Sequence, residues 1–580
     1  MRPLNQRRRE AGSSAAMDGE PATQKWQTRL GICLLIAVMA LPLRATSSES
    51  YMAKLFKHVD ATQEQYVQEL RKWVAVQSVS AFAERRPDMI RMAEMAAERV
   101  RSLGGVAELA GVGNHTTPDG EVVQLPPVVL GTFGDDPAKP TVMAYGHLDV
   151  QPARMDDGWD SDPYVLTEKD GKLYGRGVSD NKTPVLAWLN SIEAFRSIGQ
   201  PLPVNLRLVF ESLEEVGSPG LAELLARRRH TFLRDVEHMC VSDSEWLSVG
   251  VPALSYGLRG NCYFFAEVTG TNKDLHSGTY GGSVHEALGD LVALMSSLES
   301  SAGNIAVPGL YDSVAPLTRE EKEIYEKIHF DPEEFRKEIE APALLYPTKD
   351  KILMHRWRYP ALSLHGIEGA FADPGMKTVI PRRVLGKFSI RIVPNMDPDV
   401  VEDQVRRHLE AVFARRKSPN KLRVWTEVKA KPWVANVTDP LYTAGRRAFQ
   451  AVYGREPDLI REGATIPIVA ELERVVGKGV VLLPIGGADD APHSQNEKVD
   501  RVNYINGIKL FAAFLHEVAQ LPPAAAAAVA GAGAAGSNSL GGARSSEPNG
   551  GTARSTTSAE AAVMCCVLLL GMQVARRAGE

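Results

Sequence analysis

An apolar run that ends in a histidine and an aspartate constrains the fold of this chain most strongly. The run begins at Thr141, and His147 and Asp149 close it two residues apart. An apolar run of about four to eight residues that ends near a glycine is typical of a buried strand. Open α/β sheets carry their chemistry at the ends of such strands. The segment therefore predicts an α/β sheet with reactive side chains at one edge.

Further carboxylates and a second histidine follow other strand-like runs along the chain. These residues are Asp180 after Gly175–Ser179, Glu214 and Glu215 after Leu206–Phe210, Asp243 after Met239–Ser242, and His493 after Val480–Gly487. Because each comes just past an apolar run, we expect five segments to converge on one edge of a sheet.

The residue types in this set fit a site for two divalent metal ions. Two imidazoles and three carboxylates supply nitrogen and oxygen ligands, with one carboxylate shared between the ions. Two ions about 3.5–4 Å apart lower the pKa of a water molecule and polarise a carbonyl oxygen. The neighbouring Glu214 and Glu215 point in different directions on a strand or a sharp turn. One of them can therefore bind metal while the other acts as a general base.

The motifs around these residues resemble, in the same order, those of the co-catalytic zinc metallopeptidase family of aminoacylases, carboxypeptidases and dipeptidases. They are Gly146–Val150, Gly175–Lys182, Glu211–Ser218, Ser242–Ser244 and Pro492–Glu497. Four further stretches are similar to the carnosine dipeptidase branch: Lys273–Gly282, His365–Phe371, Lys377–Pro381 and Lys387–Pro394. The resemblance runs from about Tyr51 to Gln520. It implies an α/β mixed-sheet catalytic domain with helices on both faces and an inserted α+β lid and dimerisation domain.

The resemblance also implies a role for each residue of the metal site. His147 and Asp243 would hold one ion, Glu215 and His493 the other, and Asp180 would bridge them. Asp149 would orient the imidazole of His147, although a strand-end cap is the alternative reading. Glu214 would take a proton from the attacking water. We expect Zn²⁺ in both positions, with Mn²⁺ as the alternative.

A second set of residues is implied for substrate binding. His276 would reach the active site of a partner subunit and stabilise the oxyanion, which requires a homodimer formed through the lid. Arg391 and Thr378 would hold the carboxylate of a dipeptide, although Arg391 could be an exposed strand residue. Thr465 lies in a glycine-containing segment that could be a substrate loop or a simple turn.

Composition and the chain ends suggest how the chain is divided. We expect a signal peptide over residues 1–45, a catalytic domain over 46–257 and 431–520, a lid over 258–430, and a disordered tail over 521–580 with a short apolar end. This pattern favours a secreted glycoprotein, with a membrane-tethered ectoenzyme as the alternative. Cys240 and Cys262 are expected as buried thiols, and Asn114 and Asn436 as glycosylation acceptors.

The function that the resemblance implies is hydrolysis of Xaa-His dipeptides such as carnosine. Broader dipeptidase activity on substrates such as Cys-Gly, hydrolysis of N-acyl amino acids, and a non-catalytic binding protein are the alternatives. A net charge of −5 without a basic domain argues against nucleic-acid binding. The chain departs from the family pattern at Thr183 and Ser212, where glycine is usual. If either position required a positive φ, its turn would be strained.

Overall fold

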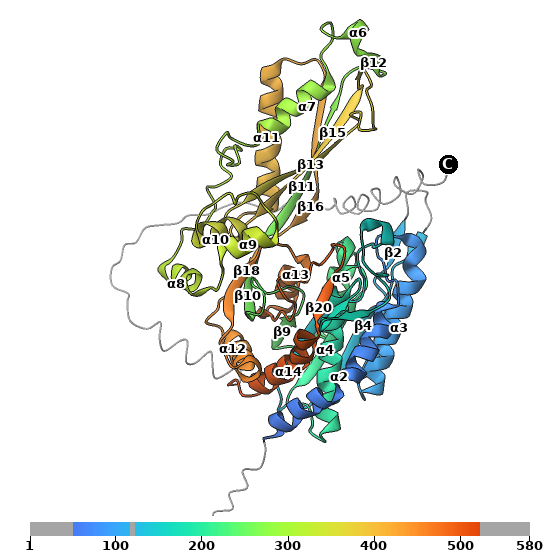
Figure 1. The fold of residues 1–580 in the computed structure, drawn as a ribbon, viewed down its shortest axis with the longest axis vertical. Coiled ribbons are helices and arrows are strands. Elements are labelled where there is room, and N and C mark those ends of the chain that lie inside the picture. The colour runs from blue at the N-terminus through green and yellow to red at the C-terminus, as the bar shows by residue number, and fades with distance from the viewer. Residues whose placement is uncertain (1–49, 117–121, 523–580) are drawn as a thin grey trace, which may run out of the picture. The chain divides into compact units, whose positions relative to one another are not determined.

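A nine-stranded mixed sheet carries the first half of the predicted site in the computed structural model, which describes residues 50–116 and 122–522 (Figure 1). The strands, in order across the sheet, are β1 (Val106–Ala110), β4 (Val128–Phe133), β8 (Asn205–Glu211), β5 (Thr141–His147), β9 (His238–Val241), β19 (Val480–Leu482), β10 (Ala253–Leu258) and β17 (Trp433–Val434), with β18 (Asp458–Glu462) also paired to β10. The predicted signal peptide and nearly all of the predicted tail lie outside the described residues.

The middle of this sheet is parallel. β5 pairs in parallel with β8 on one side and β9 on the other, and β9 pairs in parallel with β19. Parallel neighbours end at the same edge, so residues that follow β5, β8 and β9 come together there. Every residue of β5 is buried, as the apolar run predicts.

Both faces of the sheet are covered by helices, which confirms the predicted α/β class. In β5, Val142 and Ala144 belong to one core while Met143 and Tyr145 belong to the other, because successive strand residues point to opposite faces. The helices of the first core are α2 (Tyr51–Val74), α3 (Arg86–Ser102), α4 (Thr183–Ser197), α12 (Pro440–Tyr453) and α14 (Arg501–Val518), and those of the second are α5 (Leu221–Arg228) and α13 (Pro467–Val476).

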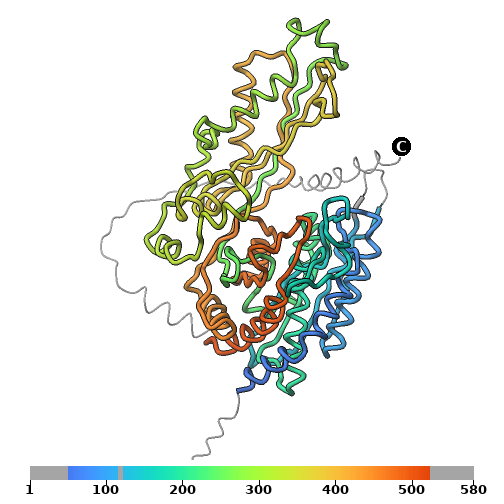
Figure 2. Tube along the Cα trace, viewed as in Figure 1, coloured from blue at the N-terminus to red at the C-terminus, as the bar shows by residue number. Residues whose placement is uncertain are grey.

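The last helix of the described chain packs against its first helix. α14 contacts both α2 and α4, and the red segment lies beside the blue and green ones in Figure 2. Trp188 of α4 stacks on Phe511 of α14 with ring centroids 4.1 Å apart. Segments far apart in the sequence therefore share one core.

A separate four-stranded antiparallel sheet is formed by the chain between the two halves of the first sheet. Its order is β13 (Ala361–Glu368), β15 (Arg383–Ile392), β11 (Gly260–Thr269) and β16 (Lys421–Ala430). Two helices, α7 (Ala287–Ser296) and α11 (Pro398–Arg416), share a core with it. Strands and helices in this inserted segment agree with the α+β class that the resemblance implied for it.

Three helices follow α7 in the chain: α8 (Arg319–Lys327), α9 (Pro332–Glu338) and α10 (Lys349–Trp357). Tyr325 and Trp357 from α8 and α10 pack in the first core. The segment 258–430 thus contributes side chains to two cores, and the predicted domain boundaries remain a prediction. Cys240 and Cys262 are buried free thiols, as expected.

The remaining elements are short. They are η1 (Ala83–Arg85), η2 (Met155–Asp157), η3 (Val178–Lys182), η4 (Glu214–Val216), α6 (Ser277–Tyr280), the pair β2 (Asn114–Thr116) and β3 (Val122–Gln124), the pair β12 (Leu275–His276) and β14 (Val379–Ile380), and the sheet of β20 (Lys498–Asp500), β7 (Lys172–Tyr174) and β6 (Thr167–Lys169). None of the helices among the described residues is long and apolar enough to span a membrane.

Candidate metal centre

The parallel strands deliver four of the predicted residues to one edge of the nine-stranded sheet. His147 is the last residue of β5, and Asp243 follows β9 by two residues. Glu214 and Glu215 open the short turn η4 after β8. Their arrival at one edge follows directly from the parallel order of β8, β5 and β9.

Asp180 alone departs from the expectation that each of the five segments follows a strand of one sheet, because His493 follows β19, which runs parallel to β9 in the nine-stranded sheet. Asp180 lies in η3, after β7 of the small three-stranded sheet. His493 lies in a long loop after β19 and has a left-handed backbone, with φ 63°. The run before Asp180 is a turn because Gly177 has φ 81°, and a Cβ there would come within 2.4 Å of Val150.

Six side chains form two groups of three. Within each group, one potential ligand atom from each side chain lies within 4.8 Å of those of the other two. The groups are His147, Glu214 and Asp243, and Asp180, Glu215 and His493. In the second group the Nε2 atom of His493 lies 2.9 Å from Asp180 and 3.1 Å from Glu215.

Asp180 connects the two groups. Its Oδ1 atom lies 2.8 Å from Nε2 of His147, and its Oδ2 atom lies 2.9 Å from Nε2 of His493. Burial opposes ionisation of Asp180, but hydrogen bonds from both imidazoles lower its pKa below the usual range. One carboxylate with an oxygen directed at each imidazole has the geometry that a bridging ligand requires.

The charges of the cluster fit a cationic occupant. Burial and then the nearby Asp243 carboxylate raise the pKa of Glu214 well above its usual value. The hydrogen bond to Asp180 is the main cause that raises the pKa of His493 to about 11. The cluster contains more carboxylates than imidazoles, and without a cation their negative charge favours protonation of the imidazoles. Donor sets of this kind bind divalent cations and release those protons. The donor set therefore fits two divalent ions.

Asp149 is fully buried behind this cluster. Its Oδ1 atom lies 3.4 Å from Nδ1 of His147, whose Nδ1 is also 3.1 Å from the Asp149 carbonyl oxygen. The same carboxylate accepts hydrogen bonds from the backbone N–H groups of Glu214 and Glu215, at 3.2 and 3.1 Å. Asp149 therefore contacts three residues of the cluster, a position suited to orienting them.

Two amide side chains that the sequence reasoning missed hold the metal-site carboxylates. The Nδ2 atom of Asn181 donates to Asp243 at 2.9 Å, and the Nε2 atom of Gln151 donates to Glu215 at 2.8 Å. Asn181 directly follows Asp180 and Gln151 lies two residues after Asp149, so proximity in sequence is the signal that could have indicated them.

Glu497 is a further residue that the sequence reasoning did not assign. Its carboxylate accepts from the backbone N–H groups of Gly177, Ser179 and Asp180 and from the guanidinium of Arg176, at 2.8 to 3.1 Å. Burial raises the pKa of Glu497 to about 7 in spite of Arg176. Glu497 thereby ties the loop that carries His493 to the turn that carries Asp180.

The predicted substrate-binding residues fall into two places. Arg391 donates from Nη1 to Oγ1 of Thr465 at 2.6 Å. His276 and Thr378 are exposed on the β12–β14 pair, where Ser277 N–H donates to the Thr378 carbonyl at 3.1 Å. Within residues 50–116 and 122–522 no hydrogen bond joins these two residues to the metal cluster.

The two departures from the family pattern leave the turns unstrained. Thr183 begins α4 with a helical φ of −67°, so its position does not require glycine. Ser212 is buried and does not have a positive φ. The strain considered at these positions is absent.

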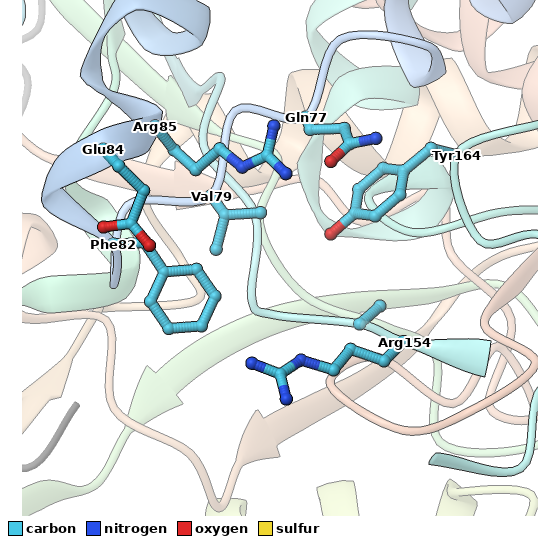
Figure 3. Close-up of a pocket in the computed structure, with 8 residues that line it drawn as sticks. Gln77, Val79, Phe82, Glu84, Arg85, Arg154 and Tyr164 are labelled. Carbon is cyan, nitrogen blue, oxygen red and sulfur yellow. The ribbon is translucent and has the colours of Figure 1, made fainter. Parts of the chain in front are cut away.

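A cavity of about 370 Å³ lies beside the segment that leads away from His147. Figure 3 shows the guanidinium groups of Arg85 and Arg154 on either side of it. It is lined by Gln77, Val79, Phe82, Glu84, Arg85, Ala153, Arg154 and Tyr164. None of these residues belongs to the metal cluster, so the cavity is separate from the predicted site.

Comparisons with known proteins identify the family of this chain. Residues 143–517 match the family model described as "Peptidase family M20/M25/M40". The chain is 50% identical to the Beta-Ala-His dipeptidase of Homo sapiens over 85% of this chain and 97% of that protein. It is 44% identical to a Cys-Gly metallodipeptidase of Schizosaccharomyces pombe over 81% and 99%. The crystal structure of human carnosine dipeptidase 1 superposes with a TM-score of 0.76 at 51% identity, covering 81% of this chain and 99% of that one. The chain therefore belongs to peptidase family M20/M25/M40.

Proposed function

We propose that this chain is a metal-dependent dipeptidase that cleaves the peptide bond of Xaa-His dipeptides such as carnosine. The observation that carries the proposal is the pair of three-residue groups joined by Asp180, found in a chain that is half identical to a Beta-Ala-His dipeptidase. Two groups sharing one carboxylate suit hydrolysis of an amide, because amide cleavage needs both an activated water and a polarised carbonyl.

Two Zn²⁺ ions, or Mn²⁺ in their place, would supply Lewis acidity: they would lower the pKa of a water and polarise the scissile carbonyl. His147 and Asp243 would hold one ion, Glu215 and His493 the other, with Asp180 between them. Zinc is favoured because imidazole and carboxylate are both common zinc ligands.

The protein side chains perform the proton transfers. Glu214 would accept a proton from the attacking water and deliver it to the amine of the departing residue. The backbone of Glu214 is held at this edge by the hydrogen bond from its N–H to Asp149. Asp149 would also keep the His147 imidazole oriented through Nδ1. His276 from a partner subunit would stabilise the oxyanion, and its exposure is compatible with that role.

A secreted homodimer is proposed with this activity. The dimer would form through the lid, and secretion would follow from the signal peptide expected over residues 1–45. Glycosylation at Asn436 is compatible with the exposure of that residue. Sedimentation of the full chain and sequencing of its N-terminus after expression in a secreting cell would test these points.

Cys-Gly hydrolysis is a second candidate, favoured by the 44% identity to a fungal Cys-Gly metallodipeptidase. Purified protein with added Zn²⁺ or Mn²⁺ should be assayed on carnosine, Cys-Gly and an N-acetyl amino acid. A higher kcat/KM for carnosine supports the proposal, and a higher value for Cys-Gly supports the second candidate. Hydrolysis of the N-acetyl amino acid alone would refute both.

A further inference from the structure

Glu211 and Ser218 are the first and last residues of the motif that carries both metal-site glutamates, and neither has a role in the reaction proposed above. Glu211 ends β8, where it pairs in register with His147 of β5. Ser218 follows the short turn η4 by two residues. The turn that carries Glu214 and Glu215 therefore lies between Glu211 and Ser218.

One oxygen of Glu211 closes this turn. Its Oε1 atom accepts a hydrogen bond from Oγ of Ser218 at 2.8 Å and another from the hydroxyl of Tyr145 at 2.6 Å. Tyr145 lies on β5 two residues before His147, and both Tyr145 and Glu211 are buried. Glu211 thus joins the far end of the turn to two neighbouring strands. We call Tyr145, Glu211 and Ser218 the turn clasp.

Backbone hydrogen bonds complete the closure of the turn. The N–H of Ser218 donates to the carbonyl of Leu213 at 2.8 Å, and the N–H of Gly217 donates to the carbonyl of Glu214 at 2.8 Å. Ser218 has a φ of 53°, which is an uncommon conformation for a residue other than glycine. The hydrogen bond from its hydroxyl to Glu211 helps to hold Ser218 in this conformation.

The beginning of the same turn is held by Asp149, which accepts the N–H groups of Glu214 and Glu215 at 3.2 and 3.1 Å. The turn is therefore fixed at both ends. Its two glutamates are neighbours in the chain, but Glu214 belongs to one three-residue group and Glu215 to the other. The conformation of this turn thus decides which carboxylate faces which group.

Stability of the strand alone does not call for a carboxyl group at position 211. In the described part of the chain, the hydrogen-bond partners of the Glu211 side chain are the two hydroxyls, and no lysine or arginine pairs with it. An apolar side chain of similar size would cost less to bury than a carboxyl group. Closing the turn, in contrast, requires an acceptor at this place.

We propose that Glu211 is a positioning residue that, through the turn clasp, directs Glu215 to its metal position and Glu214 to the attacking water. This inference rests on the proposed dipeptidase function and deepens it. Partners that orient metal ligands without touching the ion typically change metal affinity or activity about 10- to 100-fold when they are removed. The same magnitude is expected for loss of the clasp.

Two substitutions at Glu211 separate the clasp from the charge. Both hydroxyls donate to the same oxygen, so Glu211→Gln keeps an acceptor for them and should leave kcat close to the wild-type value. Glu211→Leu removes the acceptor and should lower kcat about 10- to 100-fold with little change in KM. Ser218→Ala, which removes one donor at a half-buried position, should lower kcat in the same direction by less. If Glu211→Gln loses as much kcat as Glu211→Leu, the clasp does not position the turn.

Tyr145→Phe and Tyr504→Phe form a matched pair of hydroxyl deletions. Tyr504 is also fully buried, and its hydroxyl is bonded to Asn190 at 3.0 Å and to the carbonyl of Tyr66 at 3.3 Å, in the first core. Both variants should lower the free energy of unfolding, but only Tyr145→Phe should lower kcat. An equal fall of kcat in Tyr504→Phe would show that lost stability, and not the position of the turn, is the cause.

Zinc affinity tests the clasp without using dipeptidase activity. Competition of the full chain with a chromophoric chelator should show that Glu211→Leu weakens binding of one of two Zn²⁺ ions about 10- to 100-fold, whereas Glu211→Gln does not. Wild type that hydrolyses no dipeptide but shows this difference would refute the dipeptidase function and retain the role of Glu211. Unchanged zinc affinity together with unchanged kcat in Glu211→Leu and Ser218→Ala would overturn the inference.

Discussion

Replacing Glu321 by glutamine should destabilise the fold more than any comparable change on the same helix. Glu321 of α8 pairs with Arg358 at 3.0 Å and with Arg461 through its other oxygen. The three side chains are only 5 to 12% exposed. Glutamine keeps the shape but leaves two buried guanidinium groups without an anion. Removing one partner of a buried pair costs about 3–5 kcal/mol, and slight exposure places the expected loss near the lower value.

Glu323→Gln provides the control, because Glu323 lies on the same helix and pairs with Arg319. Those side chains are 50 and 88% exposed, so the control should change the free energy of unfolding by at most about 0.5 kcal/mol. Urea unfolding followed by tryptophan fluorescence, with metal removed by chelator, would measure both variants. If Glu321→Gln comes within about 1 kcal/mol of the control, the charged triad does not stabilise the fold in the way argued.

Three further changes have defined outcomes. Glu214→Gln should lower kcat about 100- to 10,000-fold while elemental analysis still finds two ions per chain; loss of an ion would make Glu214 a ligand instead of the base. His238→Gln should reduce the loss of stability between about pH 8 and pH 5: burial lowers the pKa of His238, so the unfolded chain binds more protons and stability falls as the pH drops below about 6.5. An unchanged pH dependence would contradict this. Trp188→Ala should cost about 3–5 kcal/mol in urea unfolding, because Trp188 is fully buried and stacked on Phe511; a loss below about 1 kcal/mol would mean that the core refills the space.

The sequence predicted those parts of the site that local patterns determine. The buried run before His147 fixed one strand, and the strand-like runs before Glu214 and Asp243 fixed two more. It did not predict how Asp180 arrives, since a turn built on Gly177 and a short apolar run look alike in one dimension. Nor could it reveal that Tyr325 packs in the first core, because helix periodicity shows which face is apolar but not which surface covers it.

The least predictable feature is how Asp180 and His493 come to face each other. Asp180 follows no strand of the main sheet, and His493 lies far along the loop after β19, so the parallel order that aligns His147 and Asp243 is not enough to position them. Glu497 solves this problem, because it follows His493 closely in the chain and its carboxylate accepts the N–H of Asp180 itself. The Arg176 guanidinium that Glu497 pairs with also donates to the carbonyl of Ser494, the residue after His493, at 3.1 Å. These contacts tie together the two segments whose side chains make the 2.9 Å contact between Asp180 and His493. A buried glutamate that binds backbone N–H groups and one guanidinium leaves no periodic signal, which is why a residue that shapes the bridge between the two metal positions becomes visible only in the folded chain.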